Sequence, residues 1–226
     1  MRFSLKVSTV KTLRKVKPRL LKNENLFLKD AKTMDSKIDS VINFNRKAGD
    51  QSEQGDYKKA VQSYNEALKL LAETEDTKEQ EIKAKLLNNL GHVQVKIGDY
   101  DKALDSFNQS AAMHFRLDDM LGVGQQLGNV GSVYRDKEEW DNARKSYDKS
   151  VAAFKLAGDK TGLADQYSDI GYICVQKKEF ESALEWFYKA KALYEELNME
   201  QRAGLVGKNI SVLSGFNERE MNNEGT

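Results

Sequence analysis

The segment QLGNVGSVYRDKEEWDNARKSY, residues 126–147, carries two apolar stripes at helical spacing, separated by a short polar turn. The stripes consist of Leu127, Val130 and Gly131, and then of Trp140, Ala143 and Tyr147. Residues three, four or seven positions apart lie on one face of an α-helix, so each stripe predicts a helix with one buried face. The segment therefore predicts two helices, A and B, that pack against each other across a tight turn.

The same two-helix pattern occurs four times along the chain. The alanine of helix B recurs at Ala60, Ala103, Ala143 and Ala183, and the glycine of helix A recurs at Gly91, Gly131 and Gly171. We expect four units at about residues 36–75, 79–118, 120–158 and 160–198, then a capping helix at 200–214 that ends at Gly215, and a polar flexible tail at 216–226. Since a lone amphipathic helix pair cannot bury its apolar face, neighbouring units must stack on a shared core.

The three glycines inside the A helices need a compensating interaction. An interior glycine costs about 1 kcal/mol relative to alanine, so the three together cost roughly 3 kcal/mol. This loss is tolerable only if the missing side chain lets two helices pack closely. We therefore expect Gly91, Gly131 and Gly171 to bring helix A close to helix B.

The units resemble the tetratricopeptide repeat, in which helix A carries Leu-x-x-Leu-Gly-x-x-Tyr and helix B carries Ala-x-x-x-Phe. The third unit matches most fully, through Leu127, Val130, Gly131, Tyr134, Ala143 and Tyr147. The period is 40 residues rather than 34, and the proline that usually closes helix B is missing. In this the units are similar to the extended repeats of kinesin light chain and Pins-type adaptors. The resemblance implies an all-α, right-handed superhelical stack whose A helices line a concave groove for extended peptides.

The composition restricts the chemistry that the chain can perform. A single proline among 226 residues is typical of an almost wholly helical protein. One cysteine, Cys174, and two histidines, His92 and His114, exclude a disulfide framework and leave little for a metal site. No phosphate-binding loop, dinucleotide fingerprint or zinc-protease motif occurs. We therefore expect no enzyme activity and no cofactor, and we expect Cys174 to be a buried packing residue.

A series of short polar residues accompanies the glycines. Asn89, Asn129 and Asp169 each lie two positions before a glycine, and the 40-residue step continues to Asn209. By helical geometry these side chains face the concave side of the stack. A carboxamide there can donate to and accept from the backbone of an extended ligand, as the resemblance to extended repeats also implies. Alternatively, each side chain bonds a neighbouring helix and tightens the stack, since buried polar groups usually have internal partners.

We expect these residues and their neighbours on the A helices to line a peptide-binding groove. The full set is Arg46, Lys85, Asn88, Asn89, His92, Gln125, Asn129, Ser132, Arg135, Asp165, Asp169, Tyr172, Lys208 and Asn209. Its basic members could favour an acidic peptide, although exposed charges contribute little. Asp169 accepts but does not donate when it is ionised, so we expect the fourth unit to contact an amide or a basic side chain of the ligand.

The first 33 residues differ from the rest of the chain in charge. They contain ten Lys or Arg and two acidic residues, a net charge of +8, whereas the whole chain is +1 and the remainder is therefore about −7. We interpret residues 1–34 as a basic arm. Three alternatives are open: a mitochondrial or other organellar presequence, a flexible arm that contacts acidic surfaces, or an extension upstream of a start at Met34. Apart from the presequence alternative, we expect a cytoplasmic protein.

These features together predict a scaffold or adaptor that binds a peptide segment of a partner protein in its groove, without covalent chemistry. The alternative is an RNA-binding helical-repeat protein that uses the basic arm. The negative charge of the remaining chain argues against it, because phosphate binding needs a basic surface. No apolar stretch approaches the roughly 18 residues that a membrane-spanning helix needs.

Overall fold

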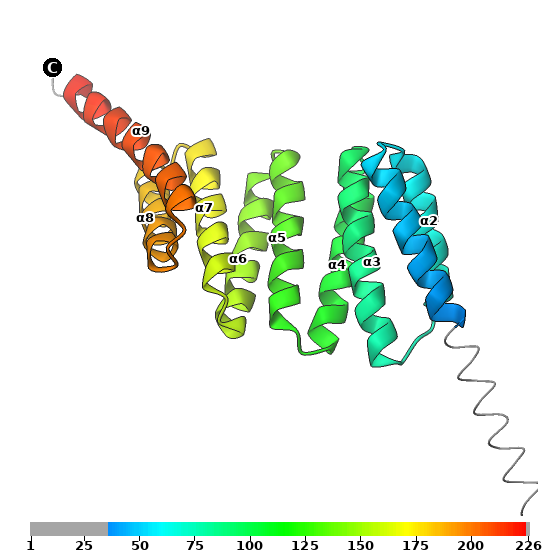
Figure 1. Cartoon of the computed structure of the whole chain (residues 1–226). Coiled ribbons are helices and arrows are strands. Elements are labelled where there is room, and N and C mark those ends of the chain that lie inside the picture. The colour runs from blue at the N-terminus through cyan, green and yellow to red at the C-terminus, as the bar shows by residue number, and fades with distance from the viewer. Residues whose placement is uncertain (1–35, 225–226) are drawn as a thin grey trace, which may run out of the picture.

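A computed structural model describes residues 36–224 of the chain, with side chains for residues 36–215. Within these residues all regular structure is helical, and the helices follow one another in an elongated stack (Figure 1). The helices are an N-terminal helix at residues 36–53, α2 (Tyr57–Leu70), α3 (Thr77–Lys96), α4 (Tyr100–Arg116), α5 (Met120–Asp136), α6 (Trp140–Ala157), α7 (Lys160–Gln176), α8 (Phe180–Glu196) and α9 (Glu200–Glu224).

Each helix packs mainly on the helices before and after it in the chain. The N-terminal helix, α3, α5 and α7 are the A helices of the four units, and α2, α4, α6 and α8 are the B helices. In addition, α5 contacts α7, so the A helices of neighbouring units touch directly. This arrangement is the stack of helix–turn–helix repeats that the sequence predicts.

Seven links between helices in the described part of the chain share one backbone motif. Each has a residue with positive φ after the helix end, namely Gly55, Gly98, Asp118, Glu138, Gly158, Lys178 and Asn198. The N–H of the next residue then donates to a carbonyl oxygen five residues earlier, as from Glu179 to Cys174 at 2.8 Å. This Schellman motif ends one helix and sets the direction of the next. The link at residues 71–76, between α2 and α3, contains no residue with positive φ.

The interior glycines bring helices A and B together as predicted. A Cβ atom on each would lie far inside the contact distance of a buried aromatic ring on helix B. The pairs are Gly91 with Phe107 at 2.7 Å, Gly131 with Tyr147 at 2.5 Å and Gly171 with Phe187 at 2.7 Å. Each ring therefore packs directly on the backbone of helix A, and this packing offsets the helix propensity that the glycines lose.

The last helix differs from its predicted length. We expected it to end at Gly215, but α9 continues to Glu224. Gly215 is not among the glycines with positive φ, whereas Gly98 and Gly158, which follow the ends of earlier helices, are. A glycine usually terminates a helix by taking the left-handed conformation, so Gly215 is instead an interior residue. The packed side of α9 contributes Ala203, Val206, Ile210 and Leu213 to the core beside α8.

Cys174 is a packing residue, as predicted. Its side chain is 1% exposed and lies in the hydrophobic core with Ile170 and Ile173. Burial raises the pKa of its thiol. A protonated, inaccessible thiol is a poor nucleophile.

The predicted basic arm at residues 1–34 lies outside the described residues, and the predicted tail at 216–226 is described only by its helical backbone up to Glu224. None of the helices in residues 36–224 is long and apolar enough to cross a membrane.

Candidate functional site

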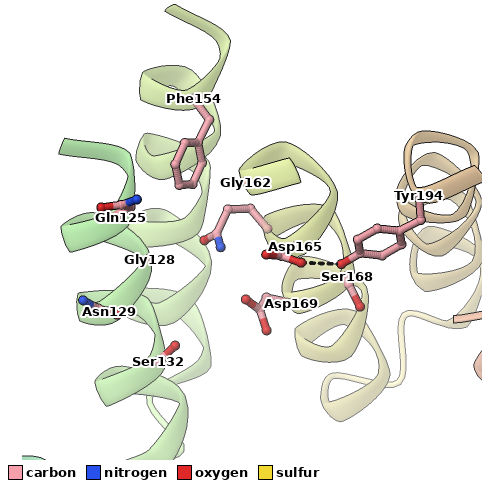
Figure 2. A pocket seen from close by; sticks show the side chains of 11 residues that line it. Gln125, Gly128, Asn129, Ser132, Phe154, Gly162, Asp165, Ser168, Asp169 and Tyr194 are labelled. Atoms are coloured by element: carbon pink, nitrogen blue, oxygen red, sulfur yellow. Dashed lines mark hydrogen bonds between the residues drawn. The ribbon is translucent and has the colours of Figure 1, made fainter. Parts of the chain in front are cut away.

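A cavity of about 450 Å³ lies between α5 and α7 (Figure 2). It is lined by Gln125, Gly128, Asn129, Ser132, Phe154, Gly162, Asp165, Gln166, Ser168, Asp169 and Tyr194. Phe154 comes from α6 and Tyr194 from α8, and all the others come from the two A helices. The volume falls within the roughly 300–1,000 Å³ of ligand pockets, and polar groups dominate the lining.

Two glycines in the lining let larger side chains pack directly on the backbone of α5 and α7. A Cβ atom on Gly128 would lie 3.2 Å from the side-chain oxygen of Gln166. A Cβ atom on Gly162 would lie 2.7 Å from the ring of Phe154. Gly162 also lies in the first turn of α7, where its N–H donates to the carboxylate of Asp159 at the helix N-cap. The two glycines therefore set the positions of Gln166 and Phe154 in the lining.

The asparagine series begins on one side of the cavity as a network of amides. The Nδ2 of Asn129 donates to the Oδ1 of Asn88 at 3.2 Å and to the Oε1 of Gln126 at 3.4 Å. The Nδ2 of Asn88 donates in turn to the Oδ1 of Asn89 at 3.2 Å. Asn89 also hydrogen-bonds the hydroxyl of Tyr64, whose pKa is raised by burial. These contacts bind α3 to α5 and α2, so part of the series has the stack-tightening role that the sequence left as an alternative.

The Asn129 carboxamide nevertheless keeps one atom free of internal contacts. Both of its hydrogen bonds in the structure use Nδ2, and no described residue donates to its Oδ1. The side chain is half-buried and lines the cavity. Asn129 therefore presents an acceptor to whatever occupies the cavity.

Two carboxylates from α7 occupy the opposite wall. Asp165 accepts a hydrogen bond from the hydroxyl of Tyr194 at 2.6 Å (Figure 2) and an ion pair from Arg202 of α9. Asp169 has a longer contact, 3.5 Å, with the guanidinium of Arg135 on α5. Burial raises the pKa of Asp169 to about 6, with Arg135 lowering it in part and Asp165 raising it further. The charge of Asp169 is thus poorly compensated within the protein.

A buried amide completes this wall. Gln166 is 7% exposed, and its Oε1 has no hydrogen-bond partner among the described residues. Gln126, at the same position of the preceding unit, is similarly buried but accepts from Asn129. A buried polar atom without a partner costs about 1–3 kcal/mol, so Gln166 is a polar group that the fold itself does not satisfy.

The cavity brings together five of the predicted groove residues, and the others lie elsewhere on the A helices and on α9. Gln125, Asn129, Ser132, Asp165 and Asp169 line it, and Arg135 contacts it through Asp169. The remaining predicted residues are Arg46 on the N-terminal helix, Lys85, Asn88, Asn89 and His92 on α3, Tyr172 on α7, and Lys208 and Asn209 on α9. Their part in ligand binding stays a prediction.

The basic residues of the predicted set differ in whether they already have contacts within the protein. Arg135 is paired with Asp136 at 3.2 Å as well as with Asp169. Arg46 hydrogen-bonds Asn43 at 3.2 Å on its own helix. Lys85 and Lys208 are exposed. The Arg135 charge is therefore already used inside the stack and adds little attraction for an acidic ligand.

His92 is exposed on α3, and its ring contacts the buried ring of Phe107. The two rings lie edge-on, with 5.1 Å between their centroids. The partial covering of the imidazole, and to a smaller degree Lys96, lowers the pKa of His92. The contact with Phe107 gives one side of this ring a packing role.

Sequence reasoning missed several residues of the cavity, among them Gln166, Phe154 and Tyr194. The recurrence of glutamine at 126 and 166, one repeat apart, is a signal that could have pointed to Gln166. Phe154 and Tyr194 also lie one repeat apart, on α6 and α8. Both belong to B helices, which the groove model left out.

Solved structures with a similar fold support the repeat architecture. The apo form of RapI has a TM-score of 0.73 at 15% identity, covering 80% of this chain and 49% of that one. Aspartyl phosphate phosphatase F from Bacillus subtilis has a TM-score of 0.66 at 15% identity, covering 82% and 51%. A Rap protein complexed with competence and sporulation factor has a TM-score of 0.59 at 15% identity, covering 81% and 50%. The chain thus spans about half the length of these proteins, and at this identity the likeness concerns the fold alone.

The sequence comparisons name the repeat itself. No curated protein sequence matches the chain. The family model of the tetratricopeptide repeat matches residues 40–114 and 126–196, which together make up well over half of the chain. The chain therefore belongs to the tetratricopeptide repeat family, with the all-α, right-handed superhelical stack of repeats that its sequence predicts.

Proposed function

We propose that this protein is a non-enzymatic interaction module that binds an extended segment of a partner protein along its A helices. The observation that carries the proposal is Asn129, a half-buried carboxamide on the wall of the cavity whose Oδ1 is not used by the stack. The Oδ1 of Asn129 is not among the buried side-chain atoms without a partner in the described part of the chain, so a ligand in the cavity can reach it and donate a hydrogen bond to it. The α5–α7 cavity is part of the binding surface in this proposal.

The mechanism is equilibrium docking. The free Oδ1 of Asn129 accepts a backbone N–H of the extended segment, which recognises the main chain without selecting a side chain. The Rap protein solved with competence and sporulation factor supports the proposal, because a similar fold there holds a bound factor. The repeat fold typically serves binding rather than catalysis.

Peptide selection tests the proposal directly. Random peptides displayed on phage are selected on the full chain, and the Kd of the best synthetic peptide is measured by fluorescence anisotropy. We expect the Asn129→Ala variant to raise this Kd at least tenfold, which corresponds to about 1.4 kcal/mol. Asn108→Ala is the matched control, since Asn108 is exposed on α4 and away from the cavity.

Two results would contradict the proposal. In one, no selected peptide binds the wild-type chain with a micromolar Kd. In the other, Asn129→Ala binds the peptide as the wild type does while its unfolding midpoint falls, which assigns Asn129 to the stack alone.

A further inference from the structure

Several hydrogen-bond acceptors in the α5–α7 cavity have no partner among the described residues. Asn129 offers its Oδ1, and no described residue bonds the Oδ2 of Asp169. The hydrogen bond and ion pair of Asp165 both use its Oδ1, which leaves its Oδ2 without a partner among the described residues. A ligand that satisfies these acceptors therefore carries hydrogen-bond donors.

The positive charges near the cavity are already committed to other contacts. Arg202 pairs with Asp165, beside Tyr194. Arg135 divides its guanidinium between Asp136 at 3.2 Å and Asp169 at 3.5 Å. Asp169 is therefore paired only at 3.5 Å, with a guanidinium that it shares with Asp136. A carboxylate taken out of water needs a nearby positive charge or hydrogen-bond donors to stabilise it.

The titration of Asp169 agrees with this geometry. Burial raises its pKa to about 6, because Arg135 only partly offsets the loss of water. An added cation within hydrogen-bonding distance would favour the ionised form and lower the pKa.

Gln166 supplies an independent indication of a ligand on the same wall. Its side chain is more than nine-tenths buried, lines the cavity, and has an oxygen without a partner among the described residues. The oxygen and nitrogen of an amide can exchange places by rotation, so this side chain can turn an acceptor to a donor-rich ligand. Gln126, its counterpart one unit earlier, has no such freedom because it accepts from Asn129.

The shape of the cavity suits a long side chain with a charged end. The ring of Phe154 forms an apolar part of the wall, against which a methylene stem can lie. An acidic side chain would instead meet two carboxylates. A metal ion is not favoured, since no group of three or more His, Cys, Asp or Glu among the described residues could hold one.

We propose that this cavity receives a basic side chain, arginine or lysine, of the bound segment, with its charged end between Asp169 and Gln166. The inference rests on the proposed function, because it names the chemistry of the residue that the groove selects. In this arrangement Asn129 hydrogen-bonds the backbone of the segment, and Asp169 forms an ion pair with the basic side chain inside the cavity.

The test compares capped pentapeptides Ac-Ala-Ala-X-Ala-Ala-NH2, in which X is arginine, lysine, citrulline or glutamate. Each is titrated into the ¹⁵N-labelled full chain, and the NMR signals of residues 128, 166 and 169 are followed. We expect the arginine and lysine peptides to shift these signals with Kd values at least tenfold lower than that of the citrulline peptide. Citrulline has the shape of arginine without its charge, so this contrast isolates the ionic contact.

Variants assign the contact to Asp169. In the Asp169→Asn variant, the ratio of the citrulline Kd to the arginine Kd should fall at least tenfold. Glu185→Gln, which makes the same charge change at an exposed site on α8, should leave the preference unchanged. The comparison of arginine with citrulline on the wild-type chain stands even if Asp169→Asn does not fold.

Equal binding of the arginine, citrulline and glutamate peptides would overturn the inference and leave a groove that reads only the backbone. Absence of any shift at the cavity would also overturn it. In that case the proposed function is decided separately, by the effect of Asn129→Ala on the phage-selected peptide.

Discussion

At the scale of single residues, the position two places before the glycine serves different purposes in successive units. Asn89 is used within the stack, through Asn88 and Tyr64. Asn129 divides its hydrogen-bonding groups between the stack and the cavity. Asp169 has the weakest internal compensation of the three. In the proposed function, a repeated position thus changes from a structural role at Asn89 to a binding role at Asp169, 80 residues later.

The weak compensation of the Asp169 charge lowers the stability of the folded protein. A carboxyl whose pKa rises from 3.8 to about 6 on folding destabilises the ionised folded state by roughly 3 kcal/mol, at 1.36 kcal/mol for each pKa unit. The folded state holds the proton more tightly, so stability is greatest below pH 4 with respect to this group and falls as the pH rises through 6. Removing the charge should recover part of that loss.

We therefore expect Asp169→Asn to raise the free energy of unfolding at pH 7.5 by about 1–2 kcal/mol, which is less than the full shift implies because solvent screens the partly exposed carboxylate. At pH 4, where the wild-type carboxyl is protonated in the folded state, the gain should nearly vanish. Urea unfolding followed by circular dichroism at the two pH values measures the difference. A variant less stable than the wild type at pH 7.5 would show that the Arg135 pair outweighs the burial.

At the scale of helices, the fold depends on how closely each A helix approaches its B helix. The rings of Phe107, Tyr147 and Phe187 fill the space above three glycines and are at most 2% exposed. Ser110 and Ser150 add a second contact in two units, since each donates from the B helix to a backbone carbonyl of the A helix, at 2.8 and 2.6 Å. The fourth unit has Ala190 at that position, and there Tyr194 of helix B donates instead to the Asp165 side chain of helix A, at 2.6 Å.

We expect Gly131→Ala to destabilise the protein by about 2 kcal/mol, although alanine is the better helix former. Its Cβ would lie 2.5 Å from the ring of Tyr147, which is fully buried and has no free space to move into. The control is Gly204→Ala in α9, where no atom lies within 4 Å of the added Cβ. That variant should gain about 0.5–1 kcal/mol from helix propensity. Thermal unfolding of both variants measures the contrast, and equal effects would refute the role assigned to the glycines.

At the scale of the whole molecule, charge separates the described stack from the arm that precedes it. Residues 1–33 carry +8 and the remainder of the chain about −7. We expect a fragment of residues 34–226 to show no binding to a 20-nucleotide single-stranded RNA at 150 mM salt, because a negative surface repels phosphates. Any binding by the full chain should weaken steeply with salt. Fluorescence anisotropy at 50 and 200 mM salt checks both, and salt-sensitive binding by the fragment would revive the RNA-binding alternative.

Much of this molecule could be predicted from its sequence, because the repeat makes every observation recur. The helix pairs, the role of Gly91, Gly131 and Gly171, and the burial of Cys174 all follow from helical spacing and side-chain size. The end of α9 did not follow, since a glycine signals a helix end only through a backbone conformation that the sequence does not display.

The cavity was less predictable, for a geometric reason. Its predicted members, such as Asn129 and Asp169, share one helix register. Gln166 could not be predicted in this way. Its amide is buried without a hydrogen-bond partner because it lies over Gly128 of α5, which has no side chain. Such a relation between two helices is set by packing across the stack rather than by spacing along the chain.

The link at residues 71–76 has a mechanical consequence. The other seven connections are closed by the same hydrogen-bonded turn, which holds the helices on either side at a fixed angle. The connection between α2 and α3 lacks that closure. The angle at this joint therefore depends on side chains, namely the cluster that Leu71 shares with Leu86 and Leu90 and the ion pair of Lys37 with Glu79. A change in these side chains would move the first unit as a rigid body, while the cavity between α5 and α7 keeps its dimensions.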